Sequence, residues 1–280
     1  MKTTISDIQA KKTRNEPIVM LTSYDYPTAI LEDRLGVDIQ LVGDSLGTNV
    51  LGYASSNEVT IADMVHHIRA VGRGANRSLV LGDMPFGSFV TPAVALESAR
   101  QLMEAGANAV KMEGEQPVLD QMRLLCGQGI PVCGHIGFKP QTDGTKARVQ
   151  GKDIERALEL IQSALELEKA GAAMVVLELV PEKLSAEITR LLSIPTIGIG
   201  AGRYCDGQVQ VVYDILGMSS RIYRHAKAFG NLGTACANAI GSYVAEVSGR
   251  TFPAEQQGAP IADDVLEAVR RSLSQPPSKK

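Results

Sequence analysis

Short runs of apolar, mostly β-branched residues recur along the chain, and a cluster of glycine, aspartate or proline follows each of them. Runs of this length without polar alternation are typical of parallel strands that are covered on both faces. The pattern predicts eight strands, of which the last is the weakest. They span residues 17–25, 37–45, 78–86, 109–114, 130–137, 173–180, 195–202 and 208–216.

Amphipathic segments with helix-start and helix-stop residues lie between several of these runs. In one of them Thr91 is a candidate N-cap, Pro92 stands at the first helical position and Gly106 follows the end. The longest segment repeats its apolar residues at helical spacing. The predicted helices between strands span residues 60–74, 91–106, 152–171 and 181–193.

Repeated strand–helix units indicate a parallel sheet, and eight of them within roughly 215 residues fit a closed (β/α)8 barrel better than an open sheet. We therefore expect one barrel domain over residues 1–250, ending with a helix at 235–249. Residues 251–280 are expected to hold a linker, a short helix at 262–273 and a disordered tail rich in proline, serine and lysine.

Composition and charge exclude several classes of function. The net charge is −3 and tryptophan is absent, so neither the basic surface nor the stacking platforms of a nucleic-acid binder are expected. No apolar run is long enough to span a membrane, and the first residues lack the apolar core of a secretory signal. The four cysteines form no CxxC pair, so we expect free thiols in a cytoplasmic protein rather than disulfides or a zinc site.

Ionisable residues collect where the second to sixth predicted strands end. The carboxyl ends of barrel strands face the active site, so these side chains are expected around one rim. Lys111 and Glu113 stand two apart and therefore on the same side of their strand. The candidate residues are Asp44, Ser45, Asp83, Lys111, Glu113, His135 and Glu178.

Three of these residues are carboxylates on successive strands. A single aspartate after a strand is more often a turn residue or a helix N-cap. Asp44, Asp83 and Glu113 gathered in one cleft would instead repel one another unless a cation lay among them. Carboxylate oxygens with water suit Mg²⁺, so the spacing favours a magnesium site.

The remaining polar residues suggest acid–base chemistry. Glu178 has apolar neighbours, and partial desolvation is expected to raise its pKa and make it a general base. The alternative is a structural ion pair, with Lys111 as a partner. Lys111 can also neutralise a substrate carboxylate or an enolate, whereas a Schiff base would be redundant beside a metal. His135 is a candidate hydrogen-bond donor, acid or ligand, although a lone strand-end histidine is more often a satisfied polar residue.

Two further features are weaker. Glycines 198, 200 and 202 lack the GxGxxG spacing of a dinucleotide site, so they are expected to allow close approach of a ligand or a tight turn into Asp206. A phosphate cradle is the less favoured alternative. His66 and His67 lie within a predicted helix and are expected to be structural.

Several strings, taken together and in order, resemble the ketopantoate hydroxymethyltransferase family from about residue 3 to about residue 255. They are TSYDYPTA at 22–29, LVGDSLG at 41–47, GDMPFGS at 82–88, AGANAVKMEG at 105–114, VCGHIGFKPQ at 132–141, LELVP at 177–181 and IGIGAG at 197–202, followed by DGQ. Each string alone is weak evidence, but the ordered set is specific.

The resemblance implies a (β/α)8 barrel of the phosphoenolpyruvate/pyruvate-binding type. Such an enzyme transfers a one-carbon unit from 5,10-methylenetetrahydrofolate to 3-methyl-2-oxobutanoate, giving 2-dehydropantoate in pantothenate and coenzyme A biosynthesis. It also implies a homodecamer of two stacked rings. The residues that match are Asp44, Asp83 and Glu113 for Mg²⁺, with Glu113 acting through water; Asp44, Ser45, Asp83, Lys111 and His135 for the keto acid; and Glu178 as the base.

The chain departs from the family pattern in the loop at 143–152, around 221–232 and at its C-terminus. None of these departures includes a candidate site residue. Two other hypotheses are a Mg²⁺-dependent C–C lyase or aldolase acting on another 2-oxo acid, and a barrel that has lost activity and serves in binding or assembly. The retained carboxylates, Lys111 and Glu178 speak against the second.

Overall fold

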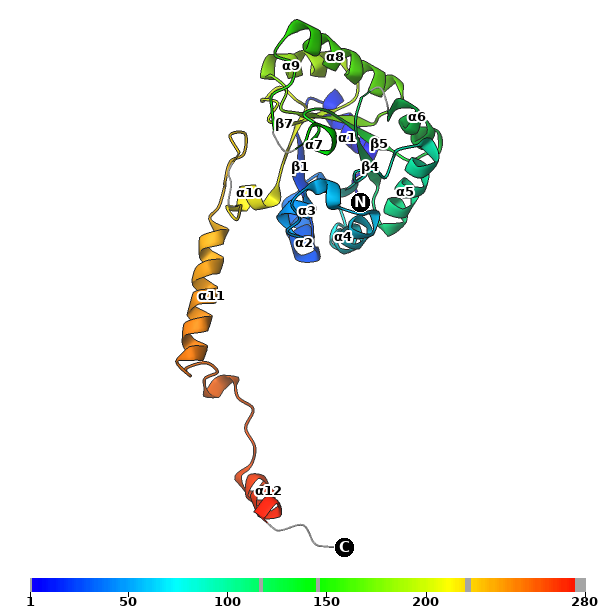
Figure 1. The fold of residues 1–280 in the computed structure, drawn as a ribbon. Coiled ribbons are helices and arrows are strands. Elements are labelled where there is room, and N and C mark those ends of the chain that lie inside the picture. The colour runs from blue at the N-terminus through cyan, green and yellow to red at the C-terminus, as the bar shows by residue number, and fades with distance from the viewer. Residues whose placement is uncertain (1, 116–117, 145–146, 220–222, 275–280) are drawn as a thin grey trace. The chain divides into compact units, whose positions relative to one another are not determined.

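The computed structural model describes residues 2–115, 118–144, 147–219 and 223–274. The chain divides into two units, Met1–Gly230 and Asn231–Lys280. The first unit is a closed barrel of parallel strands that follow one another in sequence order from β1 to β8, with helices around it (Figure 1). The predicted (β/α)8 fold class is confirmed.

Each predicted strand overlaps an observed strand that is shorter than the prediction, and β8 begins one residue before its predicted range. Pairing stops where glycine, proline and polar residues begin, which is why the apolar runs located the strands but overestimated their length. The strands are β1 Ile18–Thr22, β2 Ile39–Val42, β3 Leu79–Asp83, β4 Ala109–Glu113, β5 Val132–Gly137, β6 Met174–Glu178, β7 Thr196–Ile199 and β8 Gly207–Gln210.

The four helices predicted between strands are present as α4 Ile61–Gly74, α5 Pro92–Ala105, α8 Ile154–Lys169 and α9 Glu182–Leu191. The expected caps are observed: Thr91 accepts a hydrogen bond from the N–H of Val94, and Gly106 ends α5 in a left-handed conformation. Further helical segments were not predicted. They are α1 Ile5–Thr13, α2 Tyr26–Leu35, α3 Leu46–Asn49, η1 Ser56–Glu58, α6 Leu119–Gly127, α7 Pro140–Asp143 and α10 Val212–Leu216.

The eighth strand was predicted over residues 208–216, and the second half of this prediction was wrong. Pairing of β8 with β1 ends at Gln210 opposite Leu21, and residues from Val212 onward turn into α10. The side chain of Thr22, at the end of β1, accepts a hydrogen bond from the N–H of Val212 and so begins this turn. Local apolar character cannot distinguish the two structures here, because a long-range contact decides between them.

The glycine-rich segment after β7 makes the predicted tight turn. Gly200 and Gly202 both have left-handed backbones, and a Cβ at Gly202 would lie 2.4 Å from Cγ of Glu182 in α9. A residue with a side chain would be strained at either position. The two glycines therefore allow β7 to reach β8 without an intervening helix.

The core has two layers, inside the barrel and between the barrel and its helices. Ile8 of α1 is fully buried in the inner layer. Gln9 donates a hydrogen bond to the carbonyl of Ala173, just before β6, and Lys12 pairs with Asp206, just before β8, at 2.8 Å. Helix α1 therefore closes the end of the barrel at which the strands begin. The opposite end, where the strands finish, is left for polar side chains.

The second unit contains α11 Leu232–Ser248, the short turn η3 Glu255–Gln257 and α12 Asp263–Ser274. These confirm the helices predicted at 235–249 and 262–273. The predicted domain boundary at residue 250 stays a prediction, and the predicted disordered tail falls mainly on residues 275–280, outside the described residues. None of the helices in the described ranges is both long and apolar enough to cross a membrane.

Helix α2 buries a carboxylic acid. The side chain of Glu32 is 4% exposed, and burial raises its pKa to about 8, although the nearby hydroxyl of Ser23 opposes the change. The pKa of Glu32 is higher in the folded chain than in the unfolded one. The contribution of this side chain to the free energy of unfolding is therefore fully present below about pH 4.5. It is then lost progressively up to about pH 8.

We expect Glu32→Gln to raise stability at pH 8 by a few kcal/mol, on the order of the pKa difference converted at about 1.4 kcal/mol per unit. Glutamine keeps the shape of the side chain and needs no proton. Denaturant unfolding of both proteins at pH 5, 6.5 and 8 measures the effect. The exposed Glu16, paired with Arg14, supplies the control variant Glu16→Gln. A stability difference that does not grow from pH 5 to pH 8 would contradict the assignment.

Candidate active site

The predicted site residues lie together at the end of the barrel where the strands finish. Strand pairing aligns them, because Asp83 of β3 is opposite Lys111 of β4, and Glu113 of β4 is opposite His135 of β5. Neighbouring strands place paired residues at the same height. The full set consists of Asp44 and Ser45 after β2, Asp83 in β3, Lys111 and Glu113 in β4, His135 in β5 and Glu178 in β6.

Asp83 and Lys111 form a buried ion pair. Nζ of Lys111 lies 2.6 Å from Oδ1 of Asp83, and their side chains are 8% and 2% exposed. Burial lowers the pKa of Lys111, but the charges of Asp83, Asp44 and Glu113 outweigh burial and hold that pKa above its usual value. Lys111 therefore remains protonated. The N–H of Asp44 donates to Oδ2 of Asp83 at 3.2 Å, which fixes the second oxygen.

Three carboxylates, those of Asp44, Asp83 and Glu113, surround the single ammonium group of Lys111. Glu113 is 4% exposed, and burial raises its pKa to about 8; Lys111 opposes this rise while Asp44 and Asp83 add to it. Burial and Asp44 likewise raise the pKa of Asp83. Buried carboxylates with raised proton affinity mark a place where a further positive charge would be stabilised. The donor set, all oxygen, suits Mg²⁺.

Among the described residues, no three His, Cys, Asp or Glu side chains already converge closely enough to hold a metal ion. Mg²⁺ does not require this convergence, since it usually retains several waters and binds through one or two carboxylates. Direct binding by Asp44 and Asp83, with Glu113 contacting a water, remains compatible with the arrangement. The assignment of the three ligands stays a prediction.

His135 lies between two glutamates. Its Nδ1 is 3.6 Å from Glu113 and its Nε2 is 3.2 Å from Glu178, yet neither nitrogen has hydrogen-bond geometry to a partner in the described ranges. Burial, followed by the charge of Lys111, lowers the pKa of His135. The ring is therefore neutral near pH 7 and can donate one hydrogen bond and accept another. Its role in substrate binding stays a prediction.

Glu178 ends β6, and its side chain is 19% exposed, in keeping with the predicted partial desolvation. The position is fixed from β5, because the N–H of Phe138 donates to the carbonyl of Glu178 at 2.8 Å. This close approach requires Gly137, whose φ is +98° and whose Cβ would lie 2.2 Å from that carbonyl oxygen. The carboxylate is thus held at the rim with access to solvent.

Two residues of the site were missed by the sequence analysis. Tyr24 is 1% exposed, and its hydroxyl is 2.8 Å from Oγ of Ser45. Gln141 of α7 is 3% exposed, and it donates to both Asp44 and Glu113. Both lie within family-like strings, but nothing in their spacing indicates that they reach the carboxylates. The predicted structural role of His67 is supported by a 2.6 Å hydrogen bond between its Nδ1 and the Tyr24 carbonyl.

Comparison with known proteins identifies the family. The model of ketopantoate hydroxymethyltransferase matches residues 2–255. A 3-methyl-2-oxobutanoate hydroxymethyltransferase of Roseiflexus sp. (strain RS-1) is 49% identical over 278 residues, which cover 98% of this chain and 100% of the relative. The chain belongs to the ketopantoate hydroxymethyltransferase family. A relative of the same name from Gluconacetobacter diazotrophicus is 48% identical, with 95% of this chain and 98% of the relative covered.

Solved structures agree on the fold of this family member. Phosphonopyruvate hydrolase, in a complex with oxalate and Mg²⁺, superposes with a TM-score of 0.63 at 10% identity, covering 97% of this chain and 96% of the other. A 2,3-dimethylmalate lyase of the PEP mutase/isocitrate lyase superfamily gives 0.60 at 15% identity, with 97% and 99% covered. At such low identity the likeness supports the barrel fold alone and says nothing about substrate.

The predicted family is therefore confirmed, and so is the predicted (β/α)8 fold. The roles of the individual ketopantoate hydroxymethyltransferase site residues, the homodecamer and the cytoplasmic location stay predictions. The altered loop at 143–152 is described in part, because residues 145 and 146 lie outside the described ranges.

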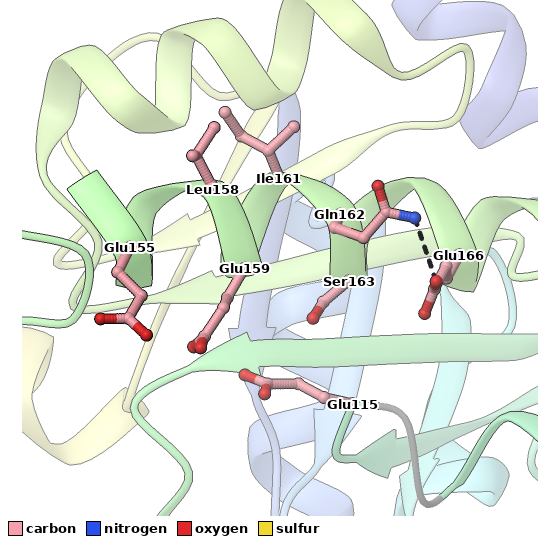
Figure 2. A pocket seen from close by; sticks show the side chains of 8 residues that line it. All are labelled: Glu115, Glu155, Leu158, Glu159, Ile161, Gln162, Ser163 and Glu166. Carbon is pink, nitrogen blue, oxygen red and sulfur yellow. Dashed lines mark hydrogen bonds between the residues drawn. The ribbon is translucent and has the colours of Figure 1, made fainter.

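A groove of about 760 Å³ lies along α8 and extends to Glu115, two residues beyond the end of β4. Figure 2 shows Leu158 and Ile161 leaving one side of α8, and Glu155, Glu159 and Ser163 leaving the other in the direction of Glu115. Arg156 pairs with both Glu115 and Glu159 at 2.6 and 2.9 Å, so part of this acidity is already neutralised. The groove contains none of the predicted site residues.

Proposed function

We propose that this chain transfers a hydroxymethyl group from 5,10-methylenetetrahydrofolate to 3-methyl-2-oxobutanoate, forming 2-dehydropantoate. Family membership supports the proposal. Relatives named 3-methyl-2-oxobutanoate hydroxymethyltransferase, which align with this chain over nearly their whole length, support it as well. The observation that carries it is the buried group of Asp44, Asp83, Lys111 and Glu113 beside a solvent-accessible Glu178. This arrangement combines sites for a cation, an anionic substrate and a base.

Asp44, Asp83 and Glu113 are the residues that would hold Mg²⁺. Their excess negative charge fits a divalent cation; the pKa values of Asp83 and Glu113 are raised first by burial and further by the charge of Asp44. When bound, Mg²⁺ supplies Lewis acidity that polarises the keto group of the substrate. These carboxylates would hold the cation at the rim, since Asp83 and Glu113 end β3 and β4 and Asp44 follows β2.

Lys111 and Ser45 are proposed to bind the keto acid. The ammonium of Lys111 stays charged because of the surrounding carboxylates, so it can stabilise negative charge that develops on the substrate oxygen. The hydroxyl of Ser45 is held by Tyr24 at 2.8 Å, which limits its rotation and presents it in one direction. Binding and orientation are thus assigned to residues with few alternative conformations.

Glu178 is proposed to remove the proton from C3 of the keto acid. The carboxylate accepts this proton, and the electrons of the C–H bond pass into the enolate of the substrate. Water adds to the methylene carbon of the folate and both C–N bonds to that carbon break, so that tetrahydrofolate leaves with the two water protons. The nucleophilic C3 bonds to the same carbon, and the resulting alkoxide takes back the proton held by Glu178 to become the new hydroxyl group. Neutral His135, with its Nε2 3.2 Å from Glu178, lies where it can help orient the base and the keto acid.

Proton NMR in D₂O tests both halves of this proposal. The full-length protein is incubated with Mg²⁺ and 3-methyl-2-oxobutanoate, with and without 5,10-methylenetetrahydrofolate. We expect the C3 proton signal to disappear without folate and 2-dehydropantoate to form with it. Exchange without product would favour a C–C lyase on a related 2-oxo acid, and neither reaction in folded protein would contradict the enzyme assignment. A sample treated with EDTA is the control.

A further inference from the structure

The segment that follows β5 is folded onto the carboxylates. Helix α7, Pro140–Asp143, is a single short turn, stabilised where the N–H of Lys139 donates to Oδ2 of Asp143 at 2.9 Å. This turn places Gln141 in the interior, where its side chain is 3% exposed. A glutamine buried to this degree needs partners for its amide.

The donors of Gln141 go to two of the three carboxylates. Nε2 donates to Oδ2 of Asp44 at 2.8 Å and to the carbonyl of Met84 at 3.1 Å. The backbone N–H of the same residue donates to Oε1 of Glu113 at 3.0 Å. One residue therefore links the end of β2 with the end of β4.

These bonds control how the carboxylates are oriented. Each bond uses one oxygen of its carboxylate and leaves the other oxygen to a different partner. Without them, Asp44 and Glu113 would rotate more freely and would turn apart because their charges repel. An uncharged donor opposes this rotation without competing with a cation, as a lysine or arginine at the same place would.

Gln141 is in turn supported from a third element. Nδ2 of Asn57, in the η1 turn, donates to the backbone carbonyl of Gln141 at 3.0 Å. The hydroxyl of Thr142 lies 3.4 Å from the same Oε1 of Glu113 that accepts from Gln141. The position of the glutamine is thus determined by groups that do not themselves approach Asp44.

We propose that Gln141 is a positioning residue that orients Asp44 and Glu113 for a divalent cation. This inference rests on the proposed function, in which those carboxylates hold Mg²⁺. Removing a residue that hydrogen-bonds to a metal ligand, without binding the metal itself, typically weakens metal affinity about 10- to 100-fold. Gln141 touches the ligands and not the reacting atoms, so its effect is exerted through metal affinity.

The test is a Mn²⁺ titration followed by electron paramagnetic resonance, in which the signal of free Mn²⁺ reports binding without turnover. Gln141→Met keeps the length of the side chain and removes its Nε2 donor. We expect the Kd for Mn²⁺ to rise about tenfold, and activity at saturating Mg²⁺ to recover to near the wild-type kcat. The matched control is Gln121→Met, another buried glutamine, whose Nε2 donates to the carbonyl of Phe89. Its Kd is expected to stay unchanged.

A second variant guards against loss of folding in the first. Asn57→Ala removes the donor to the Gln141 carbonyl and leaves Gln141 in the sequence, so we expect a smaller rise in Kd. An unchanged Kd in both folded variants would overturn the positioning role. Wild-type protein that binds no Mn²⁺ would overturn the metal site of the proposed function, and the inference with it. Recovery of kcat at saturating Mg²⁺ separates positioning from participation in the chemistry.

Discussion

Glu178→Gln is expected to lower kcat by about a thousandfold, within the range for removal of a general base. The amide has nearly the shape of the carboxylate, so β6 and its contact with Phe138 should remain intact. It cannot accept the C3 proton, however. Binding of metal and keto acid should persist, because the ion pair of Asp83 with Lys111 does not involve Glu178. C3 exchange in D₂O and the Kd for the keto acid measure the two effects separately.

Glu182→Gln supplies the matched control for this variant. Glu182 begins α9, four residues further along, where its carboxylate pairs with Arg203 at 3.1 Å and is 41% exposed. The same change there should leave exchange and turnover close to wild type. If Glu178→Gln exchanged the C3 proton at the wild-type rate, Glu178 would not be the base, and His135 would be the next residue to test.

The barrel could be predicted from sequence because its determinants are local. Strands buried on both faces need continuous apolar residues, and helices need capped amphipathic segments. The run that became β6 and the segment that became α8 carry these signals strongly. Alternation of the two then restricts the topology to a parallel sheet, and the number of units favours closure.

The sequence did not correctly predict elements whose structure depends on contacts with residues far away in the chain. The predicted strand after Gln210 gave way to α10, because its partner β1 ends at Thr22, whose hydroxyl accepts a hydrogen bond from the N–H of Val212. Helix α2 was not predicted either. It buries Glu32 and Asp33, two acidic residues that weaken the apolar pattern by which an amphipathic helix is identified.

The candidate site was located by one rule, that polar residues at the carboxyl ends of barrel strands meet. The rule applies to Asp83, Glu113 and Glu178, because each belongs to a strand whose neighbours are known once the barrel closes. It does not apply to Gln141, which reaches Asp44 from a turn 97 residues away. Such a residue has no strand position to predict, and its partners become visible only in the folded chain.

Asp83→Asn is expected to weaken Mn²⁺ binding about a hundredfold or more. This loss equals or exceeds the largest one typical of residues that only hydrogen-bond to a metal ligand. Asp83 is proposed to bind the cation, and its loss removes both a ligand and a negative charge. Keto-acid binding that depends on the metal should fall with it. Calorimetric titration with Mn²⁺, followed by the keto acid at fixed metal, measures both quantities.

In Asp83→Asn, the free energy of unfolding should change less than the free energy of metal binding. Breaking an isolated buried ion pair typically costs about 3–5 kcal/mol, because one charge is left without a partner. Lys111 is not left alone here, since Asp44 and Glu113 also hold its pKa above the usual value. The control is Asp38→Asn, which breaks the pair with Lys11 at the opposite end of β2, where the two charges lie 2.6 Å apart. It should leave Mn²⁺ binding unchanged. Wild-type metal affinity in folded Asp83→Asn protein would rule out Asp83 as a ligand.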